Sequence, residues 1–274
     1  MKLSFRLITT ALILAILLLG SSCKTKFEKI RISNDPELIL KEAHAYFAAE
    51  NYYKAQTLYE LAIPAFRGKV EAEDIFFNYA YTHYNVKAYM LSAHYFKNFA
   101  QTFGNSPKKE EADYMAAYSH YRMSPAHKLD QSNSDKAIES FQLFMNTYPN
   151  SERVKECNDL IVGLRAKMEE KAFDEGKLYF DLKRYNSATT SLANMLKDFP
   201  ETKRAAEVRY LIAKASYLLA DNSVYLKKEE RYTETIARCD DFLKKHSKTE
   251  FKKEVSSFLK DSRKELNKIT DGRS

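Results

Sequence analysis

The stretch Ser134–Ser151, SDKAIESFQLFMNTYPNS, decides the fold of this chain. Its apolar residues keep a helical period between Ala137 and Met145, and Ser134 or Asp135 can cap the first turn. The closing Tyr-Pro-Asn-Ser contains residues that end helices. The pattern therefore predicts one amphipathic helix with a defined stop.

The pattern of this helix recurs along the chain. A small residue, an apolar or aromatic residue four positions later and another three positions beyond it occur together in five places. The five triples are Ala55/Tyr59/Ala62, Ser92/Phe96/Phe99, Ala137/Phe141/Phe144, Ala188/Leu192/Met195 and Thr235/Cys239/Phe242. Such self-similarity is typical of repeat proteins, in which each unit buries its apolar face against the next.

A second helix precedes each triple, so that every unit is a helix-turn-helix. In the first unit we expect helices near residues 36–49 and 52–66, with Ala43 and Ala55 at the small positions. This arrangement resembles the tetratricopeptide repeat, in which small residues let two antiparallel helices approach. The resemblance implies an all-α fold, a right-handed solenoid of five such repeats with a capping helix at the C-terminal end.

Two insertions and one long helix interrupt the strict period. Ser124–Asn133 separates the helices of the third unit, either as a contact loop on one face of the stack or as a tolerated solvent loop. A second inserted loop is expected around Asp221–Glu230. From Glu152 to Phe180 we expect one long helix or two nearly continuous ones, and Glu250–Ile269 as the cap. The predicted division is repeats 1 to 3 over residues 34–150, and the connecting helix, repeats 4 and 5 and the cap over residues 151–274.

Residues 1–22 have the pattern of a secretory signal peptide. Lys2 and Arg6 precede the apolar run Leu7–Leu19, which is shorter than the roughly 20 residues that a helix needs to span a bilayer. We therefore expect this segment to be removed.

The small residues that lead into Cys23 resemble a bacterial lipobox, which implies acylation of the Cys23 thiol. The alternative is an ordinary signal peptide with a cysteine at this place by chance. Lys24 stands where lipoproteins of the inner membrane usually carry aspartate. The resemblance to lipoproteins thus implies a lipid anchor in the periplasmic leaflet of the outer membrane, with residues 23–33 as a lipidated linker.

The composition excludes nucleic-acid binding and gives two readings of the cysteines. Loss of the signal peptide lowers the formal net charge of +7 to +5, and the remaining lysines alternate with acids as on solvated helix faces. A basic patch for nucleic acid is therefore not expected. Cys157 and Cys239 could form a disulfide in an oxidising compartment, but their positions in helices favour two buried thiols.

No pattern in the chain points to catalysis, a metal or a cofactor. The six histidines form neither an HExxH pair nor a zinc-type cluster with cysteine, and no phosphate-binding glycine loop or GxSxG occurs. His83 and His120 fall at inward positions, where we expect satisfied core histidines. The sequence therefore predicts a protein that is not an enzyme and needs no cofactor.

The whole predicted mature chain resembles the tetratricopeptide-repeat lipoproteins of the outer-membrane β-barrel assembly machinery. The resemblance rests on Cys23, the five repeats, the Ser-Pro…Leu-Asp-Gln form of the insertion at 124–131 and the Tyr-Pro-Asn-Ser at 148–151. It implies a periplasmic adaptor that helps to insert β-barrel proteins into the outer membrane. Its later repeats would dock on periplasmic polypeptide-transport-associated domains of the central barrel-forming subunit, and its early repeats would bind unfolded outer-membrane proteins.

In a tetratricopeptide stack, the first helix of each unit lines a concave groove. The register of the small residues places several rings there, which could form a floor for an extended strand. The peptide-groove candidates are His44, Phe47, Phe77, Tyr81, Tyr84, Tyr114, Tyr118 and Tyr121. The alternative is that these rings pack between units.

Two other functions fit parts of the sequence. One is a tetratricopeptide lipoprotein scaffold for a cell-envelope or division enzyme. The other is a ligand-binding lipoprotein that feeds a nutrient transporter, which the absence of Trp disfavours because such a sugar pocket usually has an aromatic floor.

Overall fold

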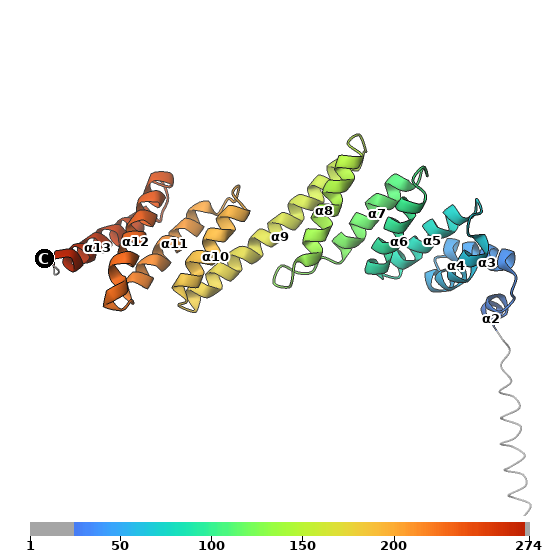
Figure 1. The fold of residues 1–274 in the computed structure, drawn as a ribbon, viewed down its shortest axis with the longest axis horizontal. Coiled ribbons are helices and arrows are strands. Elements are labelled where there is room, and N and C mark those ends of the chain that lie inside the picture. Colours follow the sequence, from blue (N-terminus) through green and yellow to red (C-terminus); the bar gives the residue numbers. More distant parts are fainter. Residues whose placement is uncertain (1–24, 272–274) are drawn as a thin grey trace, which may run out of the picture. The chain divides into compact units, whose positions relative to one another are not determined.

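The computed structural model describes residues 25–271, which form helices and no strand (Figure 1). The helices are α2 (Lys26–Arg31), α3 (Pro36–Ala48), α4 (Tyr52–Phe66), α5 (Ala72–Asn85), α6 (Tyr89–Thr102), α7 (Lys109–Arg122), α8 (Ser132–Thr147), α9 (Val154–Asp181), α10 (Tyr185–Asp198), α11 (Ala205–Asp221), α12 (Tyr225–Lys245) and α13 (Lys252–Asp271). The predicted signal peptide and Cys23 lie outside the described residues.

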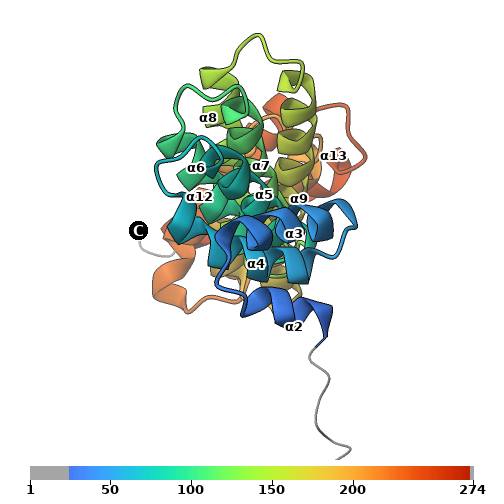
Figure 2. The same ribbon diagram turned by 90° about the vertical axis from the view of Figure 1, so that its right-hand side faces the viewer.

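Consecutive helices pack in pairs, as the repeats predict. α3 packs against α4, α5 against α6 and α11 against α12 (Figures 1 and 2). The predicted triples form the interior of these pairs, because none of their side chains is more than 2% exposed. The tetratricopeptide-type fold of paired helices is thereby confirmed, and its core is the set of residues that recur in the sequence.

The chain divides into two compact units, each described here by itself. The first comprises the residues up to Ser124 together with Asn133–Val154, and the second comprises Pro125–Ser132 and the residues from Lys155 on. The predicted boundary at residues 150 and 151 is close to this division but assigns the third-repeat insertion to the other side.

The insertion packs on α9, which explains why it belongs to the second compact unit. Lys167 Nζ donates a hydrogen bond to the Pro125 carbonyl at 2.8 Å, and Lys171 Nζ donates to the Leu129 carbonyl at 2.8 Å. The imidazole of His127 lies 3.1 Å from the Asp174 carboxylate. The insertion is therefore held by polar contacts within its own chain, while Leu129 remains 59% exposed.

The segment 23–33, expected as a linker, contains the short helix α2. The Thr25 hydroxyl caps it by accepting a hydrogen bond from the Glu28 N–H at 3.3 Å. Ile30 is 5% exposed, and the Phe27 ring packs edge-on to Tyr46 with 5.8 Å between ring centroids. Because these two apolar residues are three positions apart, they share one helix face and bind it to the first hairpin.

The tight turns between the two helices of a repeat each contain a residue in the left-handed conformation that is not glycine. Glu50, Lys87 and Lys183 have φ of 57°, 64° and 58°. In each turn the next backbone N–H bonds back to a carbonyl five residues earlier, as from Ala88 to His83 at 2.9 Å. This is the Schellman geometry, which glycine adopts without steric cost.

Replacing Lys87 by Gly is therefore expected to raise the free energy of unfolding by about 0.5 to 1 kcal/mol, because the left-handed conformation no longer strains a Cβ. Chemical denaturation followed by circular dichroism measures the change. Lys97→Gly, in the exposed interior of α6, is the control and should lose about 1 kcal/mol. A loss of similar size at Lys87 would contradict the expectation.

The same polar contact occurs at three of the joints, the places where one helix-turn-helix repeat meets the next. A hydroxyl in the joint accepts a hydrogen bond from the backbone N–H two residues later and donates one to a glutamate of the preceding unit. The pairs are Ser106 with Glu73 at 2.6 Å, Ser151 with Glu110 at 2.5 Å and Thr202 with Glu169 at 2.5 Å. A basic residue two positions after each hydroxyl then lies over an aromatic ring of the preceding unit. These pairs are Lys108 over Phe77 at 5.2 Å, Arg153 over Tyr114 at 4.1 Å and Arg204 over Phe173 at 4.5 Å.

α9 is a single long helix, the first of the two alternatives expected for this segment. Gly176 lies where a Cβ would come within 2.4 Å of the Leu192 side chain on α10, so its lack of a side chain lets these helices approach closely. Gly163, in the same helix, has nothing within 4 Å of the equivalent position. Only Gly176 is therefore required by packing.

The later repeats differ from the expectation in the length of the turn before α12 and agree with it in the state of the cysteines. The inserted loop expected around Asp221–Glu230 was wrong, since α12 already begins at Tyr225. The Lys and Glu residues at 227–230 are good helix formers, and they belong to the first turns of α12. Cys157 and Cys239 are buried thiols, as favoured, and burial raises the pKa of Cys239 to about 12.

The predicted capping helix is present as α13. Phe251 stacks on Tyr210 of α11 with 4.3 Å between centroids, and Phe258 stacks on Tyr217 with 4.9 Å. Val255 is fully buried between them, while the lysines of α13 are turned to solvent. This division of faces is what the last helix of a repeat array requires for solubility.

Candidate peptide-binding surface

The eight predicted groove residues occupy only three equivalent positions of the first helices α3, α5 and α7. Counted from the small residues Ala43, Ala80 and Ala117, the positions are three before, one after and four after. The first position holds Phe77 and Tyr114, with Leu40 as the equivalent residue of α3. The second holds His44, Tyr81 and Tyr118, and the third holds Phe47, Tyr84 and Tyr121. We call the second and third sets the aromatic rows.

The first position is buried. Phe77 is 8% exposed and packs on Phe96 and Phe99, and Tyr114 is 4% exposed and packs on Phe144 at 5.8 Å. The joint cations Lys108 and Arg153 cover both rings. These two rings are therefore packed between the two helices of their own repeat, which differs both from the predicted groove and from the alternative of packing between units.

The aromatic rows are only half-buried on α5 and α7. The Tyr84 and Tyr118 rings lie 6.2 Å apart between centroids, and Tyr118 and Tyr121 lie 5.4 Å apart. Tyr81 donates a hydrogen bond to Glu111, and burial together with this carboxylate raises the pKa of its phenol. The four side chains thus present ring faces and hydroxyl groups.

The structure adds a residue that the sequence reasoning missed. The Arg122 guanidinium lies 4.9 Å from the Tyr89 ring centroid and donates a hydrogen bond to the Tyr84 hydroxyl at 3.1 Å. It forms no ion pair within the described residues. Its position four residues after Tyr118 on the same helix is the signal that could have pointed to it.

At the α3 end, the rows are anchored to the core of the first hairpin. The Tyr59 hydroxyl and His44 Nδ1 are 2.8 Å apart, and the Phe47 ring lies 6.2 Å from that of Tyr59. Burial lowers the pKa of His44. His44 and Phe47 are half-buried, so they extend the rows with one neutral imidazole and one ring.

The two inward histidines differ. His83 is 2% exposed, its Nδ1 lies 3.0 Å from Gln56 Nε2, and burial lowers its pKa to about 4. His120 has a buried Nδ1 without a hydrogen-bond partner in the part of the chain described. The expectation of a satisfied core histidine therefore holds for His83 and fails for His120.

Residues 25–271 contain no group of three or more His, Cys, Asp or Glu side chains placed to hold a metal ion. Within the same range, no helix combines the length and apolar character needed to cross a bilayer. The recurring helical pairs define a helical-repeat protein of the tetratricopeptide type.

Comparison with known proteins identifies the family. Residues 33–225 match the model of the YfiO family, described as outer membrane lipoprotein. Because the match covers most of the chain, this protein belongs to that outer membrane lipoprotein family. The resemblance drawn from the repeats and Cys23 is thereby confirmed at the level of the family.

The chain is also similar to individual proteins. It is 26% identical over 147 residues to the outer membrane protein assembly factor BamD of Helicobacter pylori, which covers 50% of this chain and 63% of that relative's length. Among solved structures it is similar to the TPR2AB domain of yeast Sti1 in its pHSP90 complex, with 15% identity, a TM-score of 0.39 and coverage of 87% and 94% of the two chains. It is likewise similar to a tetratricopeptide protein of Thermus thermophilus, with 15% identity, a TM-score of 0.33 and coverage of 82% and 98%.

Proposed function

We propose that this protein is a lipid-anchored periplasmic adaptor that helps to insert β-barrel proteins into the outer membrane. The family and the name of the Helicobacter relative support this role. The observation that carries it is the pair of aromatic rows beside Arg122, because an adaptor for unfolded barrel proteins needs a surface that binds an extended chain.

The aromatic rows suit an extended strand in spacing and in chemistry. Side chains on one side of a strand recur about every 7 Å, which is comparable with the 6.2 and 5.4 Å between neighbouring ring centroids of the rows. Tyrosine supplies large contact area at a small cost in side-chain entropy, and its hydroxyl can bond to a strand backbone. Arg122, which no carboxylate neutralises among the described residues, adds a positive charge at the edge of the rows.

Docking on a BamA-like central barrel subunit, through its periplasmic domains, is proposed for the later repeats. Three consecutive apolar residues at the start of α12 support it: Val224, Tyr225 and Leu226 are 71%, 56% and 84% exposed. A contiguous exposed apolar segment of this kind often marks a protein interface.

The attachment to the membrane is proposed to be an acyl chain on Cys23, and Cys23→Ser should leave the protein in the soluble periplasmic fraction.

Replacing Tyr81, Tyr118 and Tyr121 together by Ala is expected to weaken binding of a fluorescent peptide from the C-terminal strand of an outer-membrane barrel by about tenfold or more. Loss of central aromatic contacts typically costs about 2 kcal/mol or more, and about 1.4 kcal/mol corresponds to tenfold. Fluorescence anisotropy measures the affinity, and circular dichroism checks that helicity is unchanged.

Tyr53→Ala is the matched control, because this tyrosine is 71% exposed on α4 outside the aromatic rows. Its affinity should match that of the wild type. An unaltered affinity of the triple variant would remove the groove assignment. Co-purification after gentle detergent extraction tests the wider role, since a scaffold for a division enzyme would bring down a hydrolase or synthase instead of a barrel protein with periplasmic domains.

A further inference from the structure

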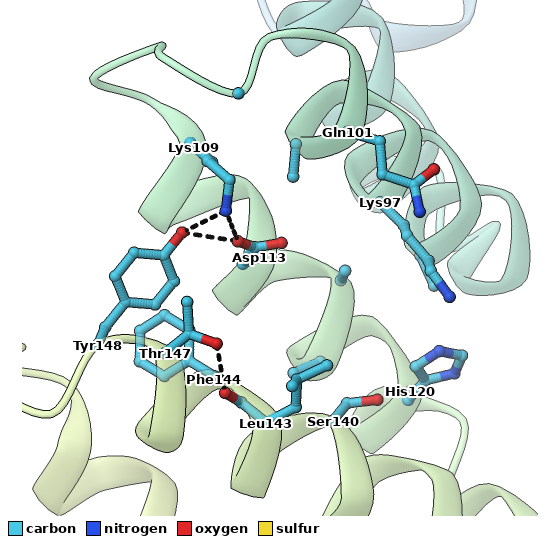
Figure 3. Close-up of a pocket in the computed structure, with 15 residues that line it drawn as sticks. Lys97, Gln101, Lys109, Asp113, His120, Ser140, Leu143, Phe144, Thr147 and Tyr148 are labelled. Carbon is cyan, nitrogen blue, oxygen red and sulfur yellow. Dashed lines mark hydrogen bonds and ion pairs between the residues drawn. The ribbon is translucent and has the colours of Figure 1, made fainter.

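A pocket of about 530 Å³ lies where α6, α7 and α8 meet (Figure 3). No residue of the aromatic rows lines it. One end is closed by a hydrogen-bonded triangle of Lys109, Asp113 and Tyr148. The other end holds Lys97 and His120. Pockets of this size commonly bind small ligands or single large side chains.

The equivalent position one repeat earlier lies between α4, α5 and α6, and there it is filled by side chains. There the Tyr95 ring stacks on His83 with 4.7 Å between centroids and 20° between planes. Tyr79 packs edge-on against Tyr95 at 4.8 Å, and the Gln56 amide lies 3.0 Å from His83 Nδ1. The first joint is therefore closed by two tyrosine rings and one amide around a histidine.

Compared with that earlier position, the pocket has the equivalent histidine but small residues in place of the two tyrosines and the glutamine. With the triples and the small residues aligned, His83 corresponds to His120, and Gln56, Tyr79 and Tyr95 correspond to Ala93, Ala116 and Ser140. All four residues line the pocket. The buried His120 Nδ1 without a partner is where the missing amide would bond. The empty space is thus the place of two aromatic rings and a hydrogen-bonding group that residues 25–271 do not supply here.

The charges around the pocket restrict what can fill it. Burial lowers the pKa of His120, and Lys136 and Lys97 lower it further, so the imidazole is neutral and suits a neutral partner. Lys97 lines the pocket and has no ion pair among residues 25–271. An occupant with a carboxylate next to its ring would therefore meet a complementary charge at the rim.

We propose that this pocket binds a tyrosine side chain of a partner polypeptide that carries acidic residues beside the tyrosine. The ring takes the place of the Tyr95 ring and stacks on His120, a backbone amide takes the place of the Gln56 amide, and the flanking carboxylate pairs with Lys97. The site uses none of the aromatic-row residues, so it stands independently of the proposed function.

The test is a variant that copies the preceding joint, Ala93→Gln/Ala116→Tyr/Ser140→Tyr, because these residues fill the pocket from within. The probe is a fluorescein-labelled Gly-Glu-Tyr-Glu-Gly peptide, with binding to the full chain read by anisotropy. We expect saturable binding to the wild type, and a loss of about tenfold or more both in the filled variant and with leucine in place of the peptide's tyrosine. Glu139→Tyr adds a ring at an exposed position of α8 outside the pocket and should bind the peptide as the wild type does.

Two further variants keep the test decisive if the triple substitution fails to fold. Ser140→Tyr fills only the ring site, and His120→Phe keeps the stacking face but removes the nitrogen, so each should weaken binding by itself. Absence of saturable binding to the wild type, or unchanged binding in the folded filled variants, overturns the proposal. Binding that is lost with Tyr118→Ala/Tyr121→Ala and kept in the filled variant also overturns it, because the peptide then occupies the aromatic rows.

Discussion

Gly176→Val is expected to lower the free energy of unfolding by about 3 kcal/mol or more. A Cβ at this position would lie 2.4 Å from Leu192 Cδ2 and 2.6 Å from Leu192 Cγ, far inside van der Waals contact. Leu192 is fully buried and packs in the core of α9, α10 and α11, so it has no free space into which to move. The helices must therefore separate, and the core between them loses contacts.

The matched control lies in the same helix. Gly163→Ala meets nothing within 4 Å and removes a flexible residue from an exposed helix interior, so it should raise the free energy of unfolding by about 1 kcal/mol. Urea denaturation of both variants, followed by circular dichroism, measures the two effects. If Gly176→Val proved as stable as the wild type, the close approach of α9 and α10 would be incorrect.

Phe141→Ala is expected to cost about 3 to 5 kcal/mol, the range for removing a buried aromatic side chain. Phe141 is fully buried in α8, and its ring lies 6.3 Å from those of Tyr114 and Tyr121. Its loss leaves a cavity beneath α7, and the same substitution should loosen the aromatic rows above it. Denaturation measures the stability, and peptide affinity at low temperature reports on the rows.

Leu143→Ala is the control for this substitution. Leu143 is two residues away on the same helix but 66% exposed, so its truncation should change the stability by no more than about 0.5 kcal/mol. A large loss at Leu143 together with a small one at Phe141 would mean that α8 is rotated relative to its position in the structure.

The contrast between these two residues shows how far the sequence pattern reaches. Both fall in the apolar period of the helix, yet only Phe141, which belongs to a recurring triple, is in the core. Recurrence at one register was therefore a better guide to burial than apolar character. For the same reason the buried triples were predictable. The long helix α9 and the cap α13 were predictable from an uninterrupted helical pattern and an amphipathic one.

The candidate site was predictable in position but not in composition. Helical register places all eight candidates on the first helices, but it cannot show that Lys108 and Arg153 cover Phe77 and Tyr114, because these cations come from the next unit. Arg122 joins the rows only through contacts with rings of the preceding unit. The start of α12 was missed because its charged residues resemble a solvent loop while also having high helix propensity.

The sequence by itself determined the all-helical fold, the recurrence of the repeats and the residues of the core, because these follow from a periodic pattern along the chain. The outer membrane lipoprotein family was implied by the resemblance of several motifs together. Only the tertiary structure decided which rings are exposed, which loop packs on α9 and where a pocket remains. The physical reason is that these features depend on side chains from neighbouring repeats. Ala93, His120 and Ser140, for example, line one pocket although they are far apart in the chain, so no local pattern signals it.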